Sequence, residues 1–367
     1  MKKVLLITQN YIPSKGGMAN SCKRIVRNLR KSGVTVHVLH FINRKYNFEI
    51  RTEINGNYAS IAIYPSEEYT LNLAQTFLES HILKFSFDIV MAFGGYLPLM
   101  WSPIVAQYFE KPLYTCIRGN DFDEFIFSKR RNVLFYALEN SAKIFSVTQE
   151  KCRKIEKIFP KVEVCYTPNG INVDEWELHS LEKESLENFS SNGGKKIITI
   201  TGQLKPKKGT LQFLENFENF KNKNNYEVRL VGDIPKEIED KLSELSFDVK
   251  SYPFVNSMEM KLLYHSSDII CIPSFYDGMP NVLLEAAACG KLVIASNIGG
   301  IPDIIEDSIS GILFNPLVKN SFVDALFRYE ELVMSGEIEA VQKNLHEKIK
   351  NLYREEDEIN NYIKHLK

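Results

Sequence analysis

The stretch Ser274–Gly290, SFYDGMPNVLLEAAACG, says most about how this chain folds. It follows the apolar run Asp268–Pro273, which predicts a buried strand of a parallel sheet. Pro280 suits the first turn of a helix because its missing N–H is not needed there, and Gly290 suits the helix end. The pattern therefore predicts a strand, a short loop and a helix over Asn281–Cys289.

Two carboxylates stand eight positions apart in this stretch, Asp277 in the loop and Glu285 in the helix. Asp277 precedes a helix N-terminus, where unpaired N–H groups and the helix dipole favour anionic or hydroxylated ligands. Glu285 lies about one turn inside the helix, at a spacing that lets its carboxylate reach the same crevice. The alternative is an ordinary strand–helix turn that carries two solvated acids.

Short apolar strands alternate with longer helical stretches along the whole chain, which is typical of parallel βαβ units. The strands predicted in the first half are Val4–Thr8, Val34–Phe41, Ala59–Tyr64, Asp88–Phe93, Leu113–Ile117, Lys143–Val147 and Val162–Tyr166. The strands predicted after it are Lys196–Thr201, Glu227–Val231, Val249–Tyr252, Asp268–Ile272, Leu292–Ala295 and Gly311–Phe314. Between the two sets, Asp174–Lys196 is rich in Glu, Ser, Asn and Gly, and its segment Ser190–Gly194 indicates a flexible linker. We therefore expect two doubly wound α/β domains that bind ligand in the crevice between them.

The bulk properties agree with two domains of ordinary size. The chain has 367 residues, 44% of them apolar and 25% charged. No apolar run reaches the roughly 18 residues that a membrane span needs, and the apolar start of the chain is too short for an export signal. The six cysteines are dispersed and form no C-x-x-C pair, so we expect buried free thiols in a reducing cytoplasm.

Charge is divided unevenly between the two halves. Residues 1–170 carry 23 basic and 14 acidic side chains, whereas the remainder carries 22 and 32. A basic first half suggests that it faces something anionic, such as a phospholipid surface or a phosphorylated acceptor. The helix predicted over Met18–Lys31 places Arg24, Arg27 and Lys31 on one face. That face is either an ordinary solvated surface or a contact for anionic lipid headgroups, which Lys129–Arg131 could extend.

The Asp277–Glu285 segment resembles the E-x7-E motif of the retaining GT-B glycosyltransferases of group 1, the large glycogen-synthase-like family four. Asp277 stands where that family usually has its first Glu, and Glu285 matches the second. The resemblance implies that Asp277 and the backbone that follows it hold the hydroxyls of the donor sugar. It also implies that Glu285 holds the ribose hydroxyls of the nucleotide. The backbone positions concerned are Gly278, Met279, Pro280 and Asn281.

Three further segments resemble motifs of the same family in the same order. Thr201–Gly209, with Gly202, Gln203 and Lys208, resembles the G-R-L-x-x-x-K-G element that clamps the donor diphosphate, although Gln203 stands where Arg is frequent. A solvated lysine-rich loop is the alternative. Gly16 and Gly17 resemble the first-domain glycine loop, although a plain turn fits equally well. Arg118 stands in place of the His of a His-Gly-x-Asp motif that approaches the transferred sugar.

The resemblance implies a GT-B fold whose two Rossmann-like domains face each other across a cleft. We expect an acceptor-side domain over residues 1–172 and a nucleotide-sugar domain over residues 173–349. The last helix, about residues 350–367, is expected to cross back to the first domain. The implied activity is retaining, metal-independent transfer of a sugar from a nucleotide-diphosphate sugar to a hydroxyl acceptor, in polysaccharide or glycolipid assembly. Asp277, Lys208 and Arg118 are the residues expected at the reaction centre.

Two other functions remain open at this point. A catalytically silent GT-B partner subunit that only binds a nucleotide sugar would explain the departures at Asp277, Gln203 and Arg118. A GT-B epimerase or phosphorylase is the other alternative. We expect a glycan or lipid-linked acceptor, no nucleic acid partner, and a cytoplasmic protein peripheral to the inner face of the membrane. The D-x-D pattern of Asp121 and Asp123 is interpreted as a decoy, so neither a metal ion nor a cofactor is expected besides the co-substrate.

Overall fold

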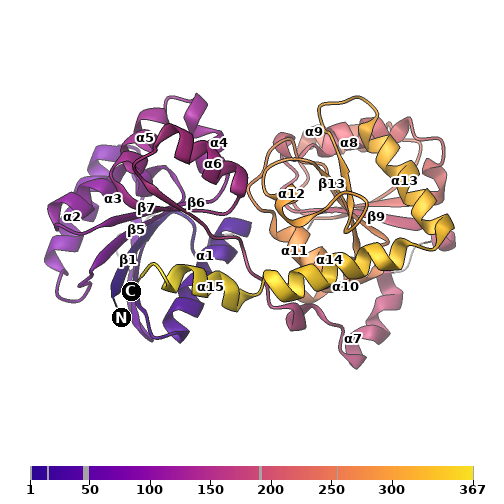
Figure 1. The fold of residues 1–367 in the computed structure, drawn as a ribbon. Helices are drawn as coiled ribbons and strands as arrows, with labels where there is room; N and C mark the ends of the chain where they lie inside the picture. Colours follow the sequence, from indigo (N-terminus) through magenta and orange to yellow (C-terminus); the bar gives the residue numbers. More distant parts are fainter. Residues whose placement is uncertain (1, 15, 44–48, 190–191, 254, 367) are drawn as a thin grey trace. The chain divides into compact units, whose positions relative to one another are not determined.

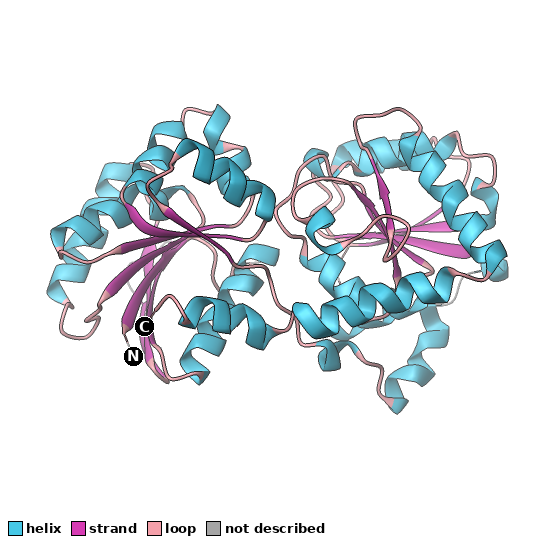
Figure 2. Cartoon of the chain, in the orientation of Figure 1, coloured by secondary structure: helices cyan, strands magenta, loops and turns pink. Residues whose placement is uncertain are grey.

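A computed structural model describes residues 2–14, 16–43, 49–189, 192–253 and 255–366. The chain divides into two compact units, each described by itself below (Figure 1). Unit 1 comprises residues 1–169 and 355–367, and unit 2 comprises residues 170–354. Each unit is an α/β domain in which helices cover both faces of a mostly parallel sheet (Figure 2).

The sheet of unit 1 has eight strands in the order β3-β4-β2-β1-β5-β6-β7-β8. Its strands are β1 (Lys3–Thr8), β2 (Thr35–Ile42), β3 (Glu49–Glu53), β4 (Gly56–Ala62), β5 (Ile89–Phe93), β6 (Leu113–Ile117), β7 (Ser141–Ser146) and β8 (Glu163–Tyr166). All neighbours pair in parallel except β3 and β4, which form an antiparallel hairpin at one edge. Strand β3 is largely polar, with Ile50 as its one apolar residue, and we did not predict it because it lacks a buried apolar run.

Helices pack on both faces of this sheet because the central strands are apolar on both sides. The helices of unit 1 are α1 (Gly17–Lys31), α2 (Glu67–Ser80), α3 (Tyr96–Tyr108), α4 (Asn120–Asp123), α5 (Arg131–Glu139), α6 (Gln149–Ile158) and α15 (Glu355–Ile363). One core contains side chains of α2, α3, α5 and α6, and the opposite core contains side chains of α1 and α15. The last helix of the chain therefore belongs to the first unit.

The sheet of unit 2 is wholly parallel, with the order β11-β10-β9-β12-β13-β14. Its strands are β9 (Lys196–Thr201), β10 (Tyr226–Val231), β11 (Asp248–Tyr252), β12 (Ile269–Ile272), β13 (Leu292–Ser296) and β14 (Ile312–Phe314). Its helices are α7 (Ser180–Ser185), α8 (Thr210–Glu218), α9 (Lys236–Leu242), α10 (Ser257–Ser266), α11 (Asn281–Ala288), α12 (Ile301–Ile304), α13 (Ser321–Ser335) and α14 (Ile338–Leu352). The predicted doubly wound α/β architecture is confirmed.

Each sheet has a point where the strand order reverses direction, and open α/β sheets bind ligands at the carboxyl edge there. In unit 2 this point lies between β9 and β12, which are neighbours although β10 and β11 intervene in the sequence. In unit 1 it lies between β1 and β5. The loops that leave these four strands carry the glycine-rich and acidic motifs of the sequence.

The Glu- and Ser-rich stretch that precedes the predicted linker Ser190–Gly194 is structured. A 3₁₀ turn forms over Val173–Trp176, α7 follows, and a second 3₁₀ turn covers Leu186–Phe189. The Glu-rich composition suits a short exposed helix as well as a linker, and composition alone does not separate the two. Of the predicted linker core, Ser190 and Ser191 lie outside the described residues.

Two arginines of the basic face of α1 contact the C-terminal helix, whereas Lys31 of the same face is exposed. Arg24 Nε donates to the Glu358 carboxylate of α15 at 2.7 Å, and Arg27 Nη2 donates to Glu355 at 2.6 Å. The Glu358 side chain is completely buried. The arginines of this face therefore bind the returning C-terminal helix, which the sequence could not show because the partners stand more than 320 positions apart.

The six cysteines are all buried thiols outside disulfide bonds, as predicted. Within the described residues, no helix has both the length and the apolar character needed to cross a membrane.

Candidate active site

Three loops of unit 2 meet at the carboxyl edge of its sheet, and hydrogen bonds join them. The loop after β9 accepts a bond from the loop after β12, because Phe275 N–H donates to the Lys207 carbonyl at 2.9 Å. The loop after β13 donates to the loop after β12, from Gly300 N–H to the Gly278 carbonyl at 2.8 Å. The loop after β12, which contains Asp277, is thus fixed from both sides.

Two glycines allow the three loops to approach this closely. Gly209 has a φ of 67°, and a Cβ there would lie 2.0 Å from the Pro273 carbonyl oxygen. Gly299 has a φ of 57°, and a Cβ there would lie 2.1 Å from the Asp277 carbonyl oxygen. Any side chain at either position would therefore push the loop after β12 away, in addition to the strain of a positive φ.

Lys208 and Asp277 come from the two loops that flank the strand-order reversal, and their side chains form an ion pair. Both are partly exposed, with 28% and 17% of the side-chain surface accessible. The second carboxylate oxygen of Asp277 accepts from Gly278 N–H at 2.9 Å. The structure thus brings together the cation predicted for the diphosphate and the acid predicted for the sugar.

Glu285 lies in the second turn of α11 and accepts a hydrogen bond from the Tyr264 hydroxyl at 2.7 Å. Tyr264 is fully buried at the end of α10, where its ring packs edge-on against Trp176 at 5.6 Å between centroids. Burial, together with the charge of Glu285, raises the pKa of Tyr264 well above its usual value, so the phenol stays protonated. No sequence motif pointed to Tyr264, because a lone tyrosine near a helix end is an ordinary core residue.

The other residues predicted on the donor side belong to the same loops. Gly202 and Gln203 are exposed just after β9, and a Cβ on Gly202 would meet open space. Met279 is buried, which indicates that its side chain packs inward and leaves any ligand contact to its backbone. Pro280 has no N–H to offer and instead caps α11, while Asn281 begins that helix.

In unit 1, the glycine pairs after β1 and β5 open helices at the sheet edge. Gly16 precedes α1 with a φ of 112°, and Gly17 is the first residue of that helix. Gly95 precedes α3, whose Leu97 N–H donates to the Gln9 side chain at 3.0 Å. The predicted first-domain glycine loop is therefore at a helix N-terminus beside the strand-order reversal, where anions are favoured.

Arg118 is buried at the end of β6, and its guanidinium already has protein partners. It donates to the Asn169 side-chain oxygen and, at 3.2 Å, to the Tyr362 hydroxyl of α15. Its guanidinium carbon lies 5.1 Å from the centre of the Phe93 ring. Asn169 also accepts from Arg24 at 3.4 Å. Since guanidinium has five N–H donors, these bonds do not exhaust it, and contact with a donor phosphate stays a prediction.

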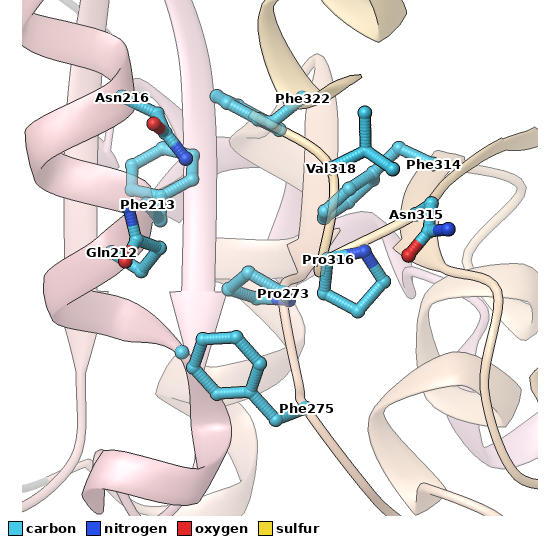
Figure 3. A pocket seen from close by; sticks show the side chains of 11 residues that line it. Gln212, Phe213, Asn216, Pro273, Phe275, Phe314, Asn315, Pro316, Val318 and Phe322 are labelled. Carbon is cyan, nitrogen blue, oxygen red and sulfur yellow. The ribbon is translucent and has the colours of Figure 1, made fainter. Parts of the chain in front are cut away.

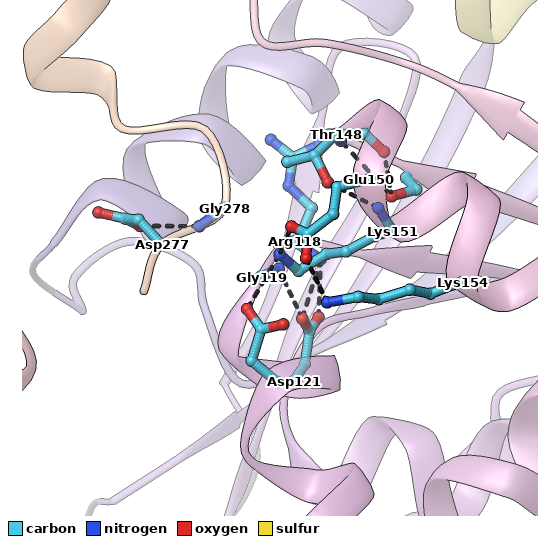
Figure 4. Close-up of polar contacts among 11 residues, drawn as sticks. Arg118, Gly119, Asp121, Thr148, Glu150, Lys151, Lys154, Asp277 and Gly278 are labelled. Atoms are coloured by element: carbon cyan, nitrogen blue, oxygen red, sulfur yellow. Dashed lines mark hydrogen bonds and ion pairs between the residues drawn. The ribbon is translucent and has the colours of Figure 1, made fainter. Parts of the chain in front are cut away.

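The carboxylates of the D-x-D pattern are engaged by the protein (Figure 4). Asp121 accepts from the backbone N–H groups of Arg118, at 3.0 and 2.9 Å, and of Gly119, at 2.7 Å. Asp123 pairs with the buried Lys151 at 2.9 Å. Burial raises the pKa of Asp121. The Asp121 carboxylate thus fixes the backbone of the loop after β6, so the first aspartate of the D-x-D pattern has a structural role.

Among the described residues, one other group has the composition of a metal site. The side chains of Glu163, Cys165 and His365 offer ligand atoms that lie within 4.8 Å of one another. Lys143 Nζ lies 2.9 Å from the Glu163 carboxylate and 3.2 Å from His365, so an ammonium group supplies the positive charge there. Burial raises the pKa of Cys165 to about 11, which disfavours the thiolate that a metal would need.

A pocket beside α8 is lined by residues of that helix, of the loop after β12 and of the segment that follows β14 (Figure 3). Phe213 and Phe322 line its upper part, and Pro273 and Phe275 line its lower part. Its volume of about 10 Å³ has room for about one water molecule. This pocket cannot hold a nucleotide, so it is packing between α8, β14 and the loop rather than a ligand site.

Comparison with known proteins agrees with the geometry. Residues 182–351 match the family "Glycosyl transferases group 1". An uncharacterized glycosyltransferase of Methanocaldococcus jannaschii is 26% identical over 339 residues, which cover 86% of this chain and 85% of the relative. A lipopolysaccharide 1,2-N-acetylglucosaminetransferase of Salmonella typhimurium is 25% identical over 205 residues, covering 52% and 53%.

Solved structures extend the likeness to the whole chain. The structure of Anabaena HepE in complex with UDP-glucose has a TM-score of 0.79 with 16% identity, and the match covers 100% of this chain and 99% of HepE. At this identity the likeness concerns the fold. Residues 182–351, which form most of unit 2, therefore belong to the group 1 glycosyl transferases, and the chain is a nucleotide-sugar-dependent glycosyltransferase with the GT-B fold.

Proposed function

We propose that this enzyme transfers a sugar from a nucleotide-diphosphate sugar to a hydroxyl acceptor with retention of the anomeric configuration and without a metal ion. The observation that carries the proposal is the ion pair of Lys208 and Asp277 at the strand-order reversal of unit 2. A cation and an acid in contact at this edge suit a ligand that carries both a diphosphate and hydroxyl groups.

Each group has a role that its chemistry supports. When the bond to the sugar breaks, negative charge develops on the departing diphosphate, and Lys208 would stabilise it electrostatically. The Gly16 and Gly17 amides and Arg118 would contribute from unit 1. Asp277 and the backbone of residues 278–281 would orient the sugar. We infer a front-side reaction in which the leaving phosphate accepts the proton of the acceptor hydroxyl.

Glu285 would bind the ribose hydroxyls of the donor nucleotide. Replacing Glu285 with alanine should weaken nucleotide binding about tenfold or more, because the ribose hydroxyls lose their charge-assisted hydrogen bond to the carboxylate. A thermal-shift panel of UDP, GDP, ADP and their sugars measures this, since a ligand that binds only the folded state raises the melting temperature. Transfer activity is then assayed with each stabilising donor.

The outcomes of that panel separate the alternatives. Stabilisation by a nucleotide sugar, followed by transfer or by slow hydrolysis of the donor, supports the proposal. Binding without turnover on any acceptor would favour a catalytically silent binding subunit. Equal affinity of wild type and the alanine variant would remove Glu285 from the site. Activity that a chelator abolishes would contradict transfer without a metal.

We also propose that the acceptor is a glycan or a lipid-linked glycan and that the protein works at the inner face of an anionic membrane. The Salmonella relative, which acts on lipopolysaccharide by its name, supports the acceptor class. In unit 1, Phe127 is 90% exposed next to three exposed basic residues, Lys129, Arg130 and Arg131. An exposed aromatic ring beside cations suits a membrane surface with anionic headgroups.

Vesicle binding tests the membrane proposal. Reversing the charge of both Lys129 and Arg131 to glutamate should weaken binding to anionic vesicles by more than tenfold, since each cation near such a surface contributes about 1 kcal/mol. Lys343→Glu with Lys350→Glu changes the net charge equally on α14 and should have little effect. Binding by wild type that does not fall with added salt would contradict an electrostatic mode.

A further inference from the structure

The hydroxyl of Tyr264 lies beside the end of strand β9 in unit 2. It donates to Glu285 of α11 at 2.7 Å, and the side chain of Thr201, the last residue of β9, is close enough to influence the pKa of the phenol. The tyrosine itself belongs to α10, so one buried oxygen links α10 to α11 beside the end of β9. Because β9 flanks the strand-order reversal, this oxygen lies beside the edge where ligands bind in such sheets.

The tyrosine ring cannot move freely. Tyr264 has no exposed surface, and its ring packs edge-on against Trp176. The residue after it, His265, uses Nε2 to bond the Trp176 carbonyl at 2.8 Å. Trp176 is thus held by the chain segment that carries the tyrosine. A hydroxyl anchored in this way fixes the position of the group that it bonds.

Glu285, in contrast, is partly accessible, as a residue that contacts a ligand must be. A carboxylate on an accessible helical side chain samples several rotamers, and ordering it on ligand binding costs free energy. A hydrogen bond from a rigid buried donor reduces that cost because the carboxylate is already oriented. A carboxylate has about four acceptor sites, and the bond from the phenol occupies one of them.

We propose that Tyr264 is a positioning residue for ribose recognition: its hydroxyl orients the Glu285 carboxylate toward the 2′- and 3′-hydroxyls of the donor nucleotide. This inference rests on the proposed role of Glu285. It adds a residue that does not touch the ligand and that acts only through the carboxylate. It follows that removing the Tyr264 hydroxyl weakens binding of a nucleotide only when that nucleotide has ribose hydroxyls.

The test is a calorimetric titration of the whole protein with UDP, GDP and ADP and with their 2′,3′-dideoxy counterparts. Tyr264→Phe removes one oxygen atom and should raise the dissociation constant of the ribonucleotide that binds by about tenfold, as loss of a hydrogen bond to a charged group does. The dideoxy nucleotide should bind wild type and variant equally. In a Glu285→Ala background, Tyr264→Phe should have no further effect on the ribonucleotide.

Tyr226→Phe is the matched control. Tyr226 is also buried, and its hydroxyl bonds Glu330 at 3.0 Å, but it stands at the opposite end of the sheet, at the start of β10. This variant loses an equivalent tyrosine–glutamate bond and should bind every nucleotide as wild type does. If Tyr264→Phe does not fold, Trp176→Leu removes the ring against which Tyr264 packs and should give a two- to threefold, ribose-dependent loss.

The outcomes are decisive in each case. A ribose-dependent loss that vanishes without Glu285 supports the inference. Equal losses for ribonucleotide and dideoxynucleotide, or no loss at all, overturn it while leaving the proposed function in place. A wild type that binds none of the three nucleotides overturns the proposed function and, with it, this inference.

Discussion

Replacing Lys208 with alanine is expected to lower kcat for sugar transfer by on the order of 10²-fold or more, because a preorganised cation beside the leaving group is lost. The ammonium of Lys208 is held in place by its ion pair with Asp277. Its charge matters most in the transition state, where the diphosphate becomes more negative. We therefore expect a larger effect on kcat than on the KM of the donor.

The controls for this prediction use other cations of unit 2. Lys221 is exposed in the loop after α8, and its alanine variant should keep full activity. Lys208→Arg keeps the charge but not the compact ammonium, and should recover only part of the rate. Lys207, whose ammonium lies 5.6 Å from the Tyr276 ring centre, is the neighbour that could take over. Full activity of Lys208→Ala would place the clamp elsewhere, and the double variant with Lys207→Ala would then locate it.

The fold was predictable because its signals are local. Apolar runs of four to six residues, each followed by a loop and an amphipathic stretch, specify a parallel α/β sheet through the period of the side chains alone. The helix predicted over Asn281–Cys289 forms over Asn281–Ala288, since Pro280 and Gly290 mark its ends. Strand β3 escaped prediction because an exposed edge strand needs no buried apolar run.

The candidate site was predictable only where its residues share one loop or motif. Lys208 and Asp277 stand in glycine-rich segments whose sequence patterns are specific. Tyr264 is different, because its significance comes from one hydrogen bond to a helix 21 positions later. The same holds for Arg24 and Arg118, whose partners in α15 are brought close by the tertiary structure alone. A charged face of a predicted helix can therefore be either a buried contact or an exposed surface, and helical periodicity does not distinguish these two cases.

The second large effect is expected on the stability of the contact between α1 and α15 in unit 1. Replacing Glu358 with alanine should destabilise the contact between α1 and α15 by about 3 kcal/mol or more, because it leaves the Arg24 guanidinium without its main partner. The Glu358 side chain is fully buried and that of Arg24 is 14% exposed, so water cannot replace the lost carboxylate well. Glu358 also lies in the first turn of α15, where a negative charge stabilises the helix.

Hydrogen exchange of the α15 amides measures this loss locally, which avoids treating a protein of two units as a single cooperative transition. A loss of about 3 kcal/mol corresponds to exchange faster by on the order of 10²-fold, at 1.4 kcal/mol per tenfold. Glu355→Ala is the matched control, because its partner Arg27 is 41% exposed and such a pair contributes about 1 kcal/mol or less. Arg24→Met combined with Glu358→Leu should restore most of the protection, since the apolar pair leaves no buried charge. Unchanged exchange in Glu358→Ala would mean that the apolar contacts of Ile359 and Tyr362 hold α15 on unit 1 without help from the ion pair.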